Sequence, residues 1–256
     1  MRFDILSIFP EALRALLGVG VLGQACEDGR IDVRCHDLRD YTDDVHRVVD
    51  DRPYGGGAGM LMKVEPFVRA IEAIKADASG TIRTILLSPQ GRLLRQDDAA
   101  RWAKLDGLIL LCGRYEGVDE RILHFIDEEI SIGDYVLSGG EVAAAAVVEA
   151  TARMTPGVVG QFDSVASDSF YGKNRVGAPQ YTRPPEFRGF AVPDVLLSGD
   201  HAKIEAYREA EAWRKTARNR PELLGLQAEA SEPQDRAAGH VGPDSGSRVE
   251  ASDEHG

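Results

Sequence analysis

Short apolar segments alternate with helical patterns over the first 152 residues. The expected strands are residues 2–8, 31–36, 83–87, 108–112 and 128–132. The expected helices are residues 10–17, 64–75, 96–104, 118–125 and 140–152. Such alternation is typical of an α/β domain in which helices cover a mostly parallel sheet. The pattern alone gives no strand order.

Glycine-bearing loops follow the last three expected strands, at Ser88–Gly91, Gly113–Gly117 and Gly133–Gly140. For any one loop, an ordinary tight turn is the alternative interpretation. The carboxyl ends of parallel strands meet at one edge of a sheet, so we expect the three loops to form one pocket there.

The third loop leads into an Ala-rich run, Val142–Ala152, made mostly of strong helix formers. We expect Ser138 to cap this helix, with Glu141 completing a capping box. A strand-to-helix turn of this kind presents unpaired N–H groups to a ligand.

Composition excludes several classes of protein. The chain is 43% hydrophobic and 28% charged, which fits a globular protein, and no apolar run approaches a membrane span. Met1–Pro10 is too short and too charged for a signal peptide. Cys26, Cys35 and Cys112 show no CxxC spacing, so we expect reduced thiols, no structural zinc and a cytoplasmic location.

Charge is unevenly distributed along the chain, whose net charge is -12. Residues 1–170 hold 18 Lys and Arg against 28 Asp and Glu, and residues 228–256 hold 2 against 7. Residues 171–227 hold 10 against 7 and are therefore locally basic. A local basic region is the feature that marks a nucleic-acid partner, whatever the total charge.

The segment 37–62 interrupts the α/β pattern. It carries His46, Arg47, Arg52 and four glycines between positions 55 and 59. A loop this long in a compact domain is usually functional, and disorder is the alternative. Its glycines match neither the P-loop nor the dinucleotide fingerprint.

Composition changes again beyond the α/β region, and we divide the chain accordingly. Residues 1–160 are expected to form the catalytic domain and 161–175 a flexible linker. Residues 176–227 are expected to form a helical RNA-binding domain, with helices from about Asp200 to Arg218 and from Pro221. A solvated helix face is the alternative for the basic residues there. Residues 228–256 are expected to be a disordered acidic tail.

Five runs of sequence closely resemble the bacterial tRNA (guanine-N(1)-)-methyltransferase family, of the SPOUT superfamily, over roughly residues 1–226. They are Asp50–Gly57, Leu87–Gly91, Gly113–Gly117, Ser131–Glu141 and Tyr181–Pro184. The resemblance implies a deep trefoil knot that holds S-adenosylmethionine, and a homodimer with composite active sites. It also implies methylation of the guanosine immediately 3′ of the anticodon in tRNA, assisted by magnesium.

The same resemblance assigns the site residues. Cofactor contacts fall on Leu87, Ser88, Pro89, Gly113, Tyr115, Glu116, Ile132, Gly133, Tyr135, Leu137, Gly139 and Gly140. RNA contacts fall on Asp50, Arg52, Gly55, Gly59, Arg183 and Arg214. Asp168 corresponds to the general base and Arg153 to the activating arginine. From sequence alone, Asp168 could equally be a turn aspartate and Arg153 a partner of the helix dipole.

The chain departs from the resemblance at Tyr171–Gln180, which lacks the Leu-Leu-Asp-Cys-Pro-His run common before Tyr-Thr-Arg-Pro. Two rival functions stay open. One is another SPOUT methyltransferase that acts on ribosomal RNA or on a ribose hydroxyl. The other is a non-catalytic module that binds RNA or a nucleotide.

Overall fold

A five-stranded parallel sheet forms the centre of the protein. A computed structural model describes residues 1–160, 168–172 and 174–225. The strand order is β2-β1-β6-β5-β7, and every neighbouring pair is parallel. The bounds are β1 Arg2–Ser7, β2 Asp32–Asp37, β5 Ile82–Leu93, β6 Gly107–Cys112 and β7 Glu128–Ser131. The predicted α/β class with a mostly parallel sheet is therefore confirmed.

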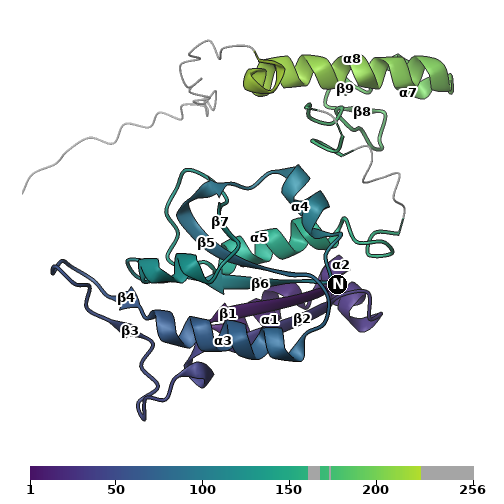
Figure 1. Ribbon diagram of the computed structural model, residues 1–256. Helices are drawn as coiled ribbons and strands as arrows, with labels where there is room; N and C mark the ends of the chain where they lie inside the picture. Colours follow the sequence, from purple (N-terminus) through teal and green to yellow (C-terminus); the bar gives the residue numbers. More distant parts are fainter. Residues whose placement is uncertain (161–167, 173, 226–256) are drawn as a thin grey trace, which may run out of the picture.

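Helices cover both faces of this sheet (Figure 1). They are α1 Pro10–Leu17, α2 Gly20–Glu27, α3 Val64–Asp77, α4 Gln96–Trp102 and α5 Glu141–Ala152. Side chains alternate across a strand, so β1 serves two cores. Phe3 and Ile5 pack in the core shared with α1, α2 and α5, whereas Leu6 packs in the core shared with α3.

One prediction between residues 18 and 125 needs correction, and two segments for which no element was predicted are ordered. Residues 18–30 include the unpredicted helix α2, whose pattern is diluted by two glycines. The expected helix 118–125 is a short 3₁₀ turn, η2 Glu120–His124, begun by Asp119, whose carboxylate accepts from the N–H of Arg121. Part of the 37–62 segment is ordered as η1 Leu38–Tyr41 and the antiparallel pair β3 Asp50–Asp51 and β4 Leu61–Met62.

β5 is longer than predicted, because the chain pairs with β7 again after the first glycine loop. Ile130 of β7 stands opposite Leu87 and then opposite Arg92. Residues 88–91 therefore bulge from a strand that resumes beyond them. A side chain at Gly91 would place its Cβ 2.4 Å from the backbone N of Ile130, so this crossing requires glycine.

Beyond residue 175 the chain forms a hairpin and helices. The elements are β8 Glu186–Phe187, β9 Phe190–Ala191, α7 Asp194–Leu197, α8 His201–Asn219 and η3 Pro221–Leu224. Asp200 caps α8 by accepting from the N–H of Lys203, which agrees with the predicted start of this helix. Linker residues 161–167 and the tail beyond 225 lie outside the described residues.

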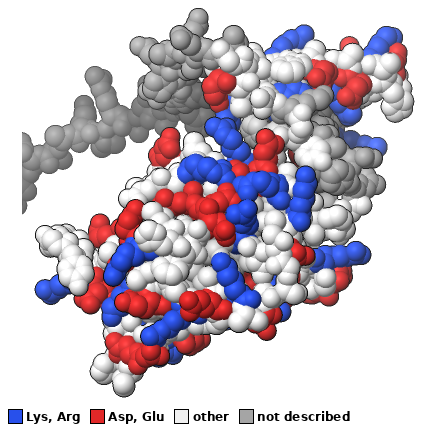
Figure 2. Space-filling view, viewed as in Figure 1, with Lys and Arg blue, Asp and Glu red and all other residues white. Residues whose placement is uncertain are grey.

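An ion network ties α4 to β5 and β7. Glu128 of β7 accepts hydrogen bonds from Arg101 at 2.8 Å and from the indole of Trp102 at 3.1 Å, and it also contacts Arg92. Arg92 also pairs with Asp98 at 2.8 Å. Figure 2 shows acidic and basic side chains crowded together in the middle of the displayed face. Burial alone would raise the pKa of Glu128, but these hydrogen bonds outweigh it and lower the pKa from 4.5 to about 2.

This network predicts a pH-dependent stability. A carboxylate whose pKa is lower in the folded state contributes stability that is complete above its unfolded pKa. The contribution should be lost as the pH falls from about 4.5 to about 2. We expect Glu128→Gln to lower the free energy of unfolding at pH 7 by about 1–2 kcal/mol. The effect is no larger because the partner arginines are half-exposed and water screens their charge.

Urea unfolding at pH 7 and at pH 3 measures this effect. The exposed Glu72→Gln on α3 is the matched control. The difference between the two variants should shrink at pH 3. An equal penalty at both pH values would contradict the assignment.

Candidate active site

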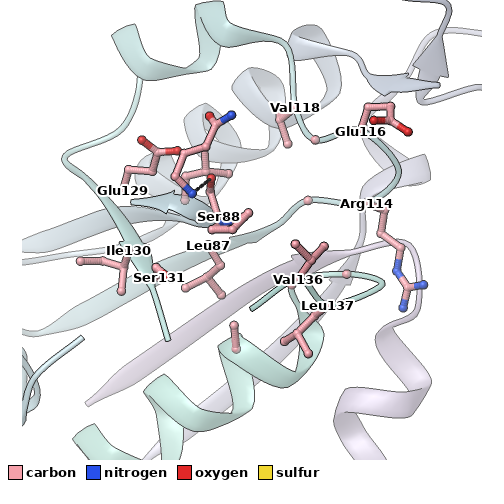
Figure 3. A pocket seen from close by; sticks show the side chains of 18 of the residues that line it. Leu87, Ser88, Arg114, Glu116, Val118, Glu129, Ile130, Ser131, Val136 and Leu137 are labelled. Atoms are coloured by element: carbon pink, nitrogen blue, oxygen red, sulfur yellow. Dashed lines mark hydrogen bonds between the residues drawn. The ribbon is translucent and has the colours of Figure 1, made fainter. Parts of the chain in front are cut away.

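The three glycine loops surround one cavity of about 450 Å³ at the carboxyl ends of β5, β6 and β7. All twelve predicted cofactor residues line it. Figure 3 shows Ser88 and Glu129 on one side, Arg114 and Glu116 on the other, and Val136 and Leu137 between them. The expected single pocket at the sheet edge is confirmed, while cofactor contact by each residue stays a prediction.

The sequence analysis missed several members of this wall. Leu61 reaches it from β4, and Glu129 and Ile130 come from within β7. Other lining residues outside the three predicted loops are Val118, Glu120, Ile122 and Ala143. Most of them neighbour a predicted residue in sequence, so the loop pattern could have found them. Leu61 could not be found this way, because it depends on how the 37–62 segment folds back.

The second and third loops are joined at Gly140. Its N–H donates to the carbonyl of Gly113 at 2.9 Å. A Cβ at position 140 would lie 2.7 Å from the Cα of Cys112, so no other residue fits without moving the backbone. Cys112 itself is fully buried, and burial raises its pKa, which suits a small core residue and not a nucleophile.

The start of α5 differs from the prediction. Gly140 occupies the N-cap position and no side chain caps the helix, so the expected role of Ser138 is wrong. Glu141 does not complete a capping box. Its buried carboxylate accepts from the hydroxyl of Ser7 at 2.6 Å and from Arg114 at 3.0 Å. Arg114 in turn lies 4.4 Å from the ring centre of Phe9. Tertiary hydrogen bonds thus replace the local cap and connect β1, β6 and α5.

The 59–62 segment docks on the second loop. Met60 O accepts from the N–H of Glu116, and the N–H of Met62 donates to Gly117 O, each at 3.0 Å. A Cβ at Gly59 would lie 2.5 Å from the carboxylate of Glu116, and Gly59 has φ +89°. Gly59, a predicted RNA-binding residue, therefore lies against Glu116, a predicted cofactor-binding residue.

Arg153 and Asp168 meet at a second cavity. Arg153 follows α5, and its guanidinium donates to the Asp168 carboxylate at 2.7 Å. Their side chains are 38% and 51% exposed, so a ligand can reach both. This cavity, of about 500 Å³, is lined by Gln96, Ala146, Glu149, Ala150, Arg153, Met154, Asp168, Ser169 and Tyr171. It shares no lining residue with the first cavity.

The predicted RNA residues fall into two groups. Asp50, Arg52, Gly55 and Gly59 lie on or between β3 and β4, whereas Arg183 precedes β8 and Arg214 lies on α8. Figure 1 shows these two regions well apart.

Neither a metal cluster nor a membrane-crossing helix is found in the described part of the chain. No group of three or more His, Cys, Asp or Glu side chains gathers there to hold a metal ion. No described helix is long and apolar enough to cross a bilayer.

Comparison with known proteins connects this geometry to a family. The model of the family described as tRNA (Guanine-1)-methyltransferase TrmD matches residues 1–226. A protein from Anaeromyxobacter sp. (strain K) is 52% identical over 225 residues, which cover 88% of this chain and 91% of the relative. One from Thermobifida fusca (strain YX) is 50% identical over 248 residues, or 92% and 94% of the two chains. Both are named tRNA (guanine-N(1)-)-methyltransferase. The chain therefore belongs to the tRNA (guanine-N(1)-)-methyltransferase family, as its five motifs predicted.

Proposed function

We propose that this chain transfers the methyl group of S-adenosylmethionine to N1 of the guanosine immediately 3′ of the tRNA anticodon. Family membership supports the guanine-N1 chemistry. The observation that carries the proposal is the Arg153–Asp168 contact at 2.7 Å, which sets a cation beside a carboxylate.

This pair complements the edge of guanine. N1–H is a hydrogen-bond donor and O6 an acceptor, side by side on the base. Asp168 accepts and Arg153 donates, so guanine can take up both partners of the ion pair. Adenine has an acceptor at N1 and a donor at N6, which is the opposite order. The contact therefore favours guanine.

Asp168 and Arg153 also fit the reaction. Asp168 takes the N1 proton while N1 forms its bond to the methyl carbon and the sulfur–methyl bond breaks. Arg153 stabilises the negative charge that develops on O6. Positioned proton transfer contributes about 10²–10⁴-fold to such a rate.

The first cavity fits the cofactor. Its volume of about 450 Å³ lies in the range typical of small-molecule sites. Backbone at Gly113 and Gly140 can approach a ligand closely, and the carboxylates of Glu116 and Glu129 can accept from hydroxyl or amino groups. The bound cofactor supplies an electrophilic methyl group, so no covalent enzyme intermediate is needed. No group of three or more His, Cys, Asp or Glu side chains among the described residues forms a magnesium site.

Helix α5 separates the two cavities. Gly140 precedes this helix and Arg153 follows it, which puts their backbones about 20 Å apart at 1.5 Å per residue. Within one chain the Arg153–Asp168 pair thus lies at the far end of α5 from Gly140, although the two cavities also reach Ala143 and Ala146 of that helix. We propose a symmetric homodimer in which Asp168 and Arg153 serve the partner's cavity.

The finer features of the fold are also proposals. Residues 88–91 bulge from β5 between its two pairings with β7. Family membership is what supports a trefoil knot around the cofactor cavity. The basic residues of 176–227, including Arg183 and Arg214, support a tRNA-binding domain. Asp50, Arg52 and Gly55 on the β3–β4 hairpin would contact RNA near the cofactor cavity.

Methyl transfer from labelled S-adenosylmethionine tests the activity. A tRNA transcript with guanosine 3′ of the anticodon should yield 1-methylguanosine on nucleoside analysis, and a transcript with adenosine there should stay unlabelled. Asp168→Asn should lower the single-turnover rate by about 10²–10⁴-fold. A methyl group on ribose or on ribosomal RNA would favour another SPOUT activity. Binding of tRNA without any transfer would favour a non-catalytic module.

Gly140→Val tests the cofactor cavity. The added side chain must displace the backbone at Cys112, so we expect S-adenosylmethionine binding to be lost in calorimetry. Gly160→Val is the matched control, because nothing lies within 4 Å of a Cβ at that position. It should bind like the unaltered protein. Equal S-adenosylmethionine affinity in Gly140→Val and Gly160→Val would show that the cofactor does not bind in this cavity.

Mixing two inactive variants tests the composite site. Asp168→Ala keeps the cavity and loses the base, whereas Gly140→Val keeps the base and loses the cavity. After joint unfolding and refolding, about half the dimers are mixed and each has one intact site. About a quarter of the activity should therefore return. No recovery would mean that each base serves its own chain.

A further inference from the structure

The segment that carries Asp168 is bonded to α8. The N–H of Val176 donates to the Thr216 hydroxyl of α8 at 3.1 Å. Gly177 N–H donates to the hydroxyl of Ser169 at 2.8 Å, and Phe170 N–H donates to Arg175 O at 3.0 Å. The residues directly after Asp168 are therefore fixed to a turn that α8 holds.

Thr216 is built to receive this turn. It is fully buried, on a helix whose other buried residue is Ala212. The Thr216 hydroxyl donates its proton to Ala212 O at 2.7 Å. A lone pair on the same oxygen accepts the hydrogen bond from the N–H of Val176. A buried acceptor left without its donor is costly, which makes this bond specific.

An ion pair provides a second attachment. Arg175 donates to the Glu209 carboxylate of α8 at 2.6 Å, and the Arg175 side chain is only 15% exposed. Trp213 donates to the other Glu209 oxygen at 3.0 Å. Such a shielded, oriented pair fixes geometry better than an exposed one.

Backbone strain marks the same place. Phe170 has φ +68°, a left-handed conformation that is unfavourable for an aromatic residue. The Arg220 guanidinium lies 5.5 Å from the centre of its ring. Strained residues persist where their surroundings determine them, and they often support a functional group. The neighbouring functional group here is Asp168, two residues earlier.

We propose that α8 positions the Asp168 carboxylate through an anchor formed by Ser169, Arg175, Glu209 and Thr216. This inference rests on the proposed function, because it concerns how the base is placed. Asp168 is thereby held between Arg153 at the end of α5 and the turn on α8. Binding of tRNA by the basic side chains of α8 and placement of the base are then coupled through one helix.

Two pairs of variants of the full chain test the anchor. Glu209→Gln removes the charge from the ion pair, and Glu205→Gln is its exposed control one turn earlier on α8. Thr216→Val removes the acceptor, and Thr216→Ser retains it. We expect Glu209→Gln and Thr216→Val to lower the single-turnover rate at saturating tRNA by at least about tenfold, because small misplacement of a catalytic group is costly. Their S-adenosylmethionine affinity should not change, and both control variants should react at the unaltered rate.

Two further readouts separate positioning from stability. Amide hydrogen exchange in the peptide covering 168–177 should speed up in Glu209→Gln and Thr216→Val, while exchange in β6 should not. The double variant Arg175→Ala, Glu209→Gln should lose no more of the single-turnover rate than either single variant, since both changes break the same ion pair.

Asp168→Asn, measured alongside, distinguishes two failures. If Asp168→Asn is inactive while Glu209→Gln and Thr216→Val react normally, the anchor is wrong and the base assignment stands. If Asp168→Asn reacts normally, the base assignment is wrong and the anchor fails with it. A rate loss in Glu209→Gln that saturating tRNA fully restores would place α8 in tRNA binding alone and overturn the anchor.

Discussion

The contact between the start of α5 and the end of β6 determines both halves of the site. Gly140 donates to Gly113 O at 2.9 Å, and Glu141 binds Arg114 beside it. This contact closes the third loop against the second and so shapes the first cavity. Because α5 is a rigid helix that begins there, the same contact also fixes where Arg153 stands at its far end.

The sequence predicted features that depend on local pattern. Apolar strands followed by glycine loops were enough to expect one pocket at the carboxyl edge of the sheet. The helix cap at Ser138 failed for a physical reason. The capping pattern considers only hydrogen bonds between residues close in sequence. Glu141 instead accepts hydrogen bonds from Ser7 and Arg114, which are distant in sequence. Likewise, no pattern of apolar residues in the sequence predicts that Leu61 lines the first cavity.

The proposed catalytic pair, Arg153 and Asp168, was harder to predict from the sequence. An arginine after a helix and an aspartate in a polar stretch each have an ordinary structural role, so only the resemblance selected Arg153 and Asp168. Their 2.7 Å contact depends on how the chain returns to the end of α5 after residue 160. The anchor on α8 is further still from prediction. One side of it, Arg175 with the backbone donors Val176 and Gly177, falls within Tyr171–Gln180, where the chain departs from the family pattern, so resemblance gives no guide to that side.

The placement of the proposed base follows from what the proposed composite site would require. The first cavity, which is proposed to hold the cofactor, lies at the edge of one sheet, and such a site gains from rigidity. A base that serves another chain's cavity cannot belong to that sheet, so it must project from its own chain and still be oriented. In the proposed reaction Arg153 alone cannot orient Asp168, because guanine would displace their ion pair. The proposed reaction therefore calls for a second support on the other side of the carboxylate, and the bonds of Thr216 and Glu209 on α8 to the turn after Asp168 could supply it.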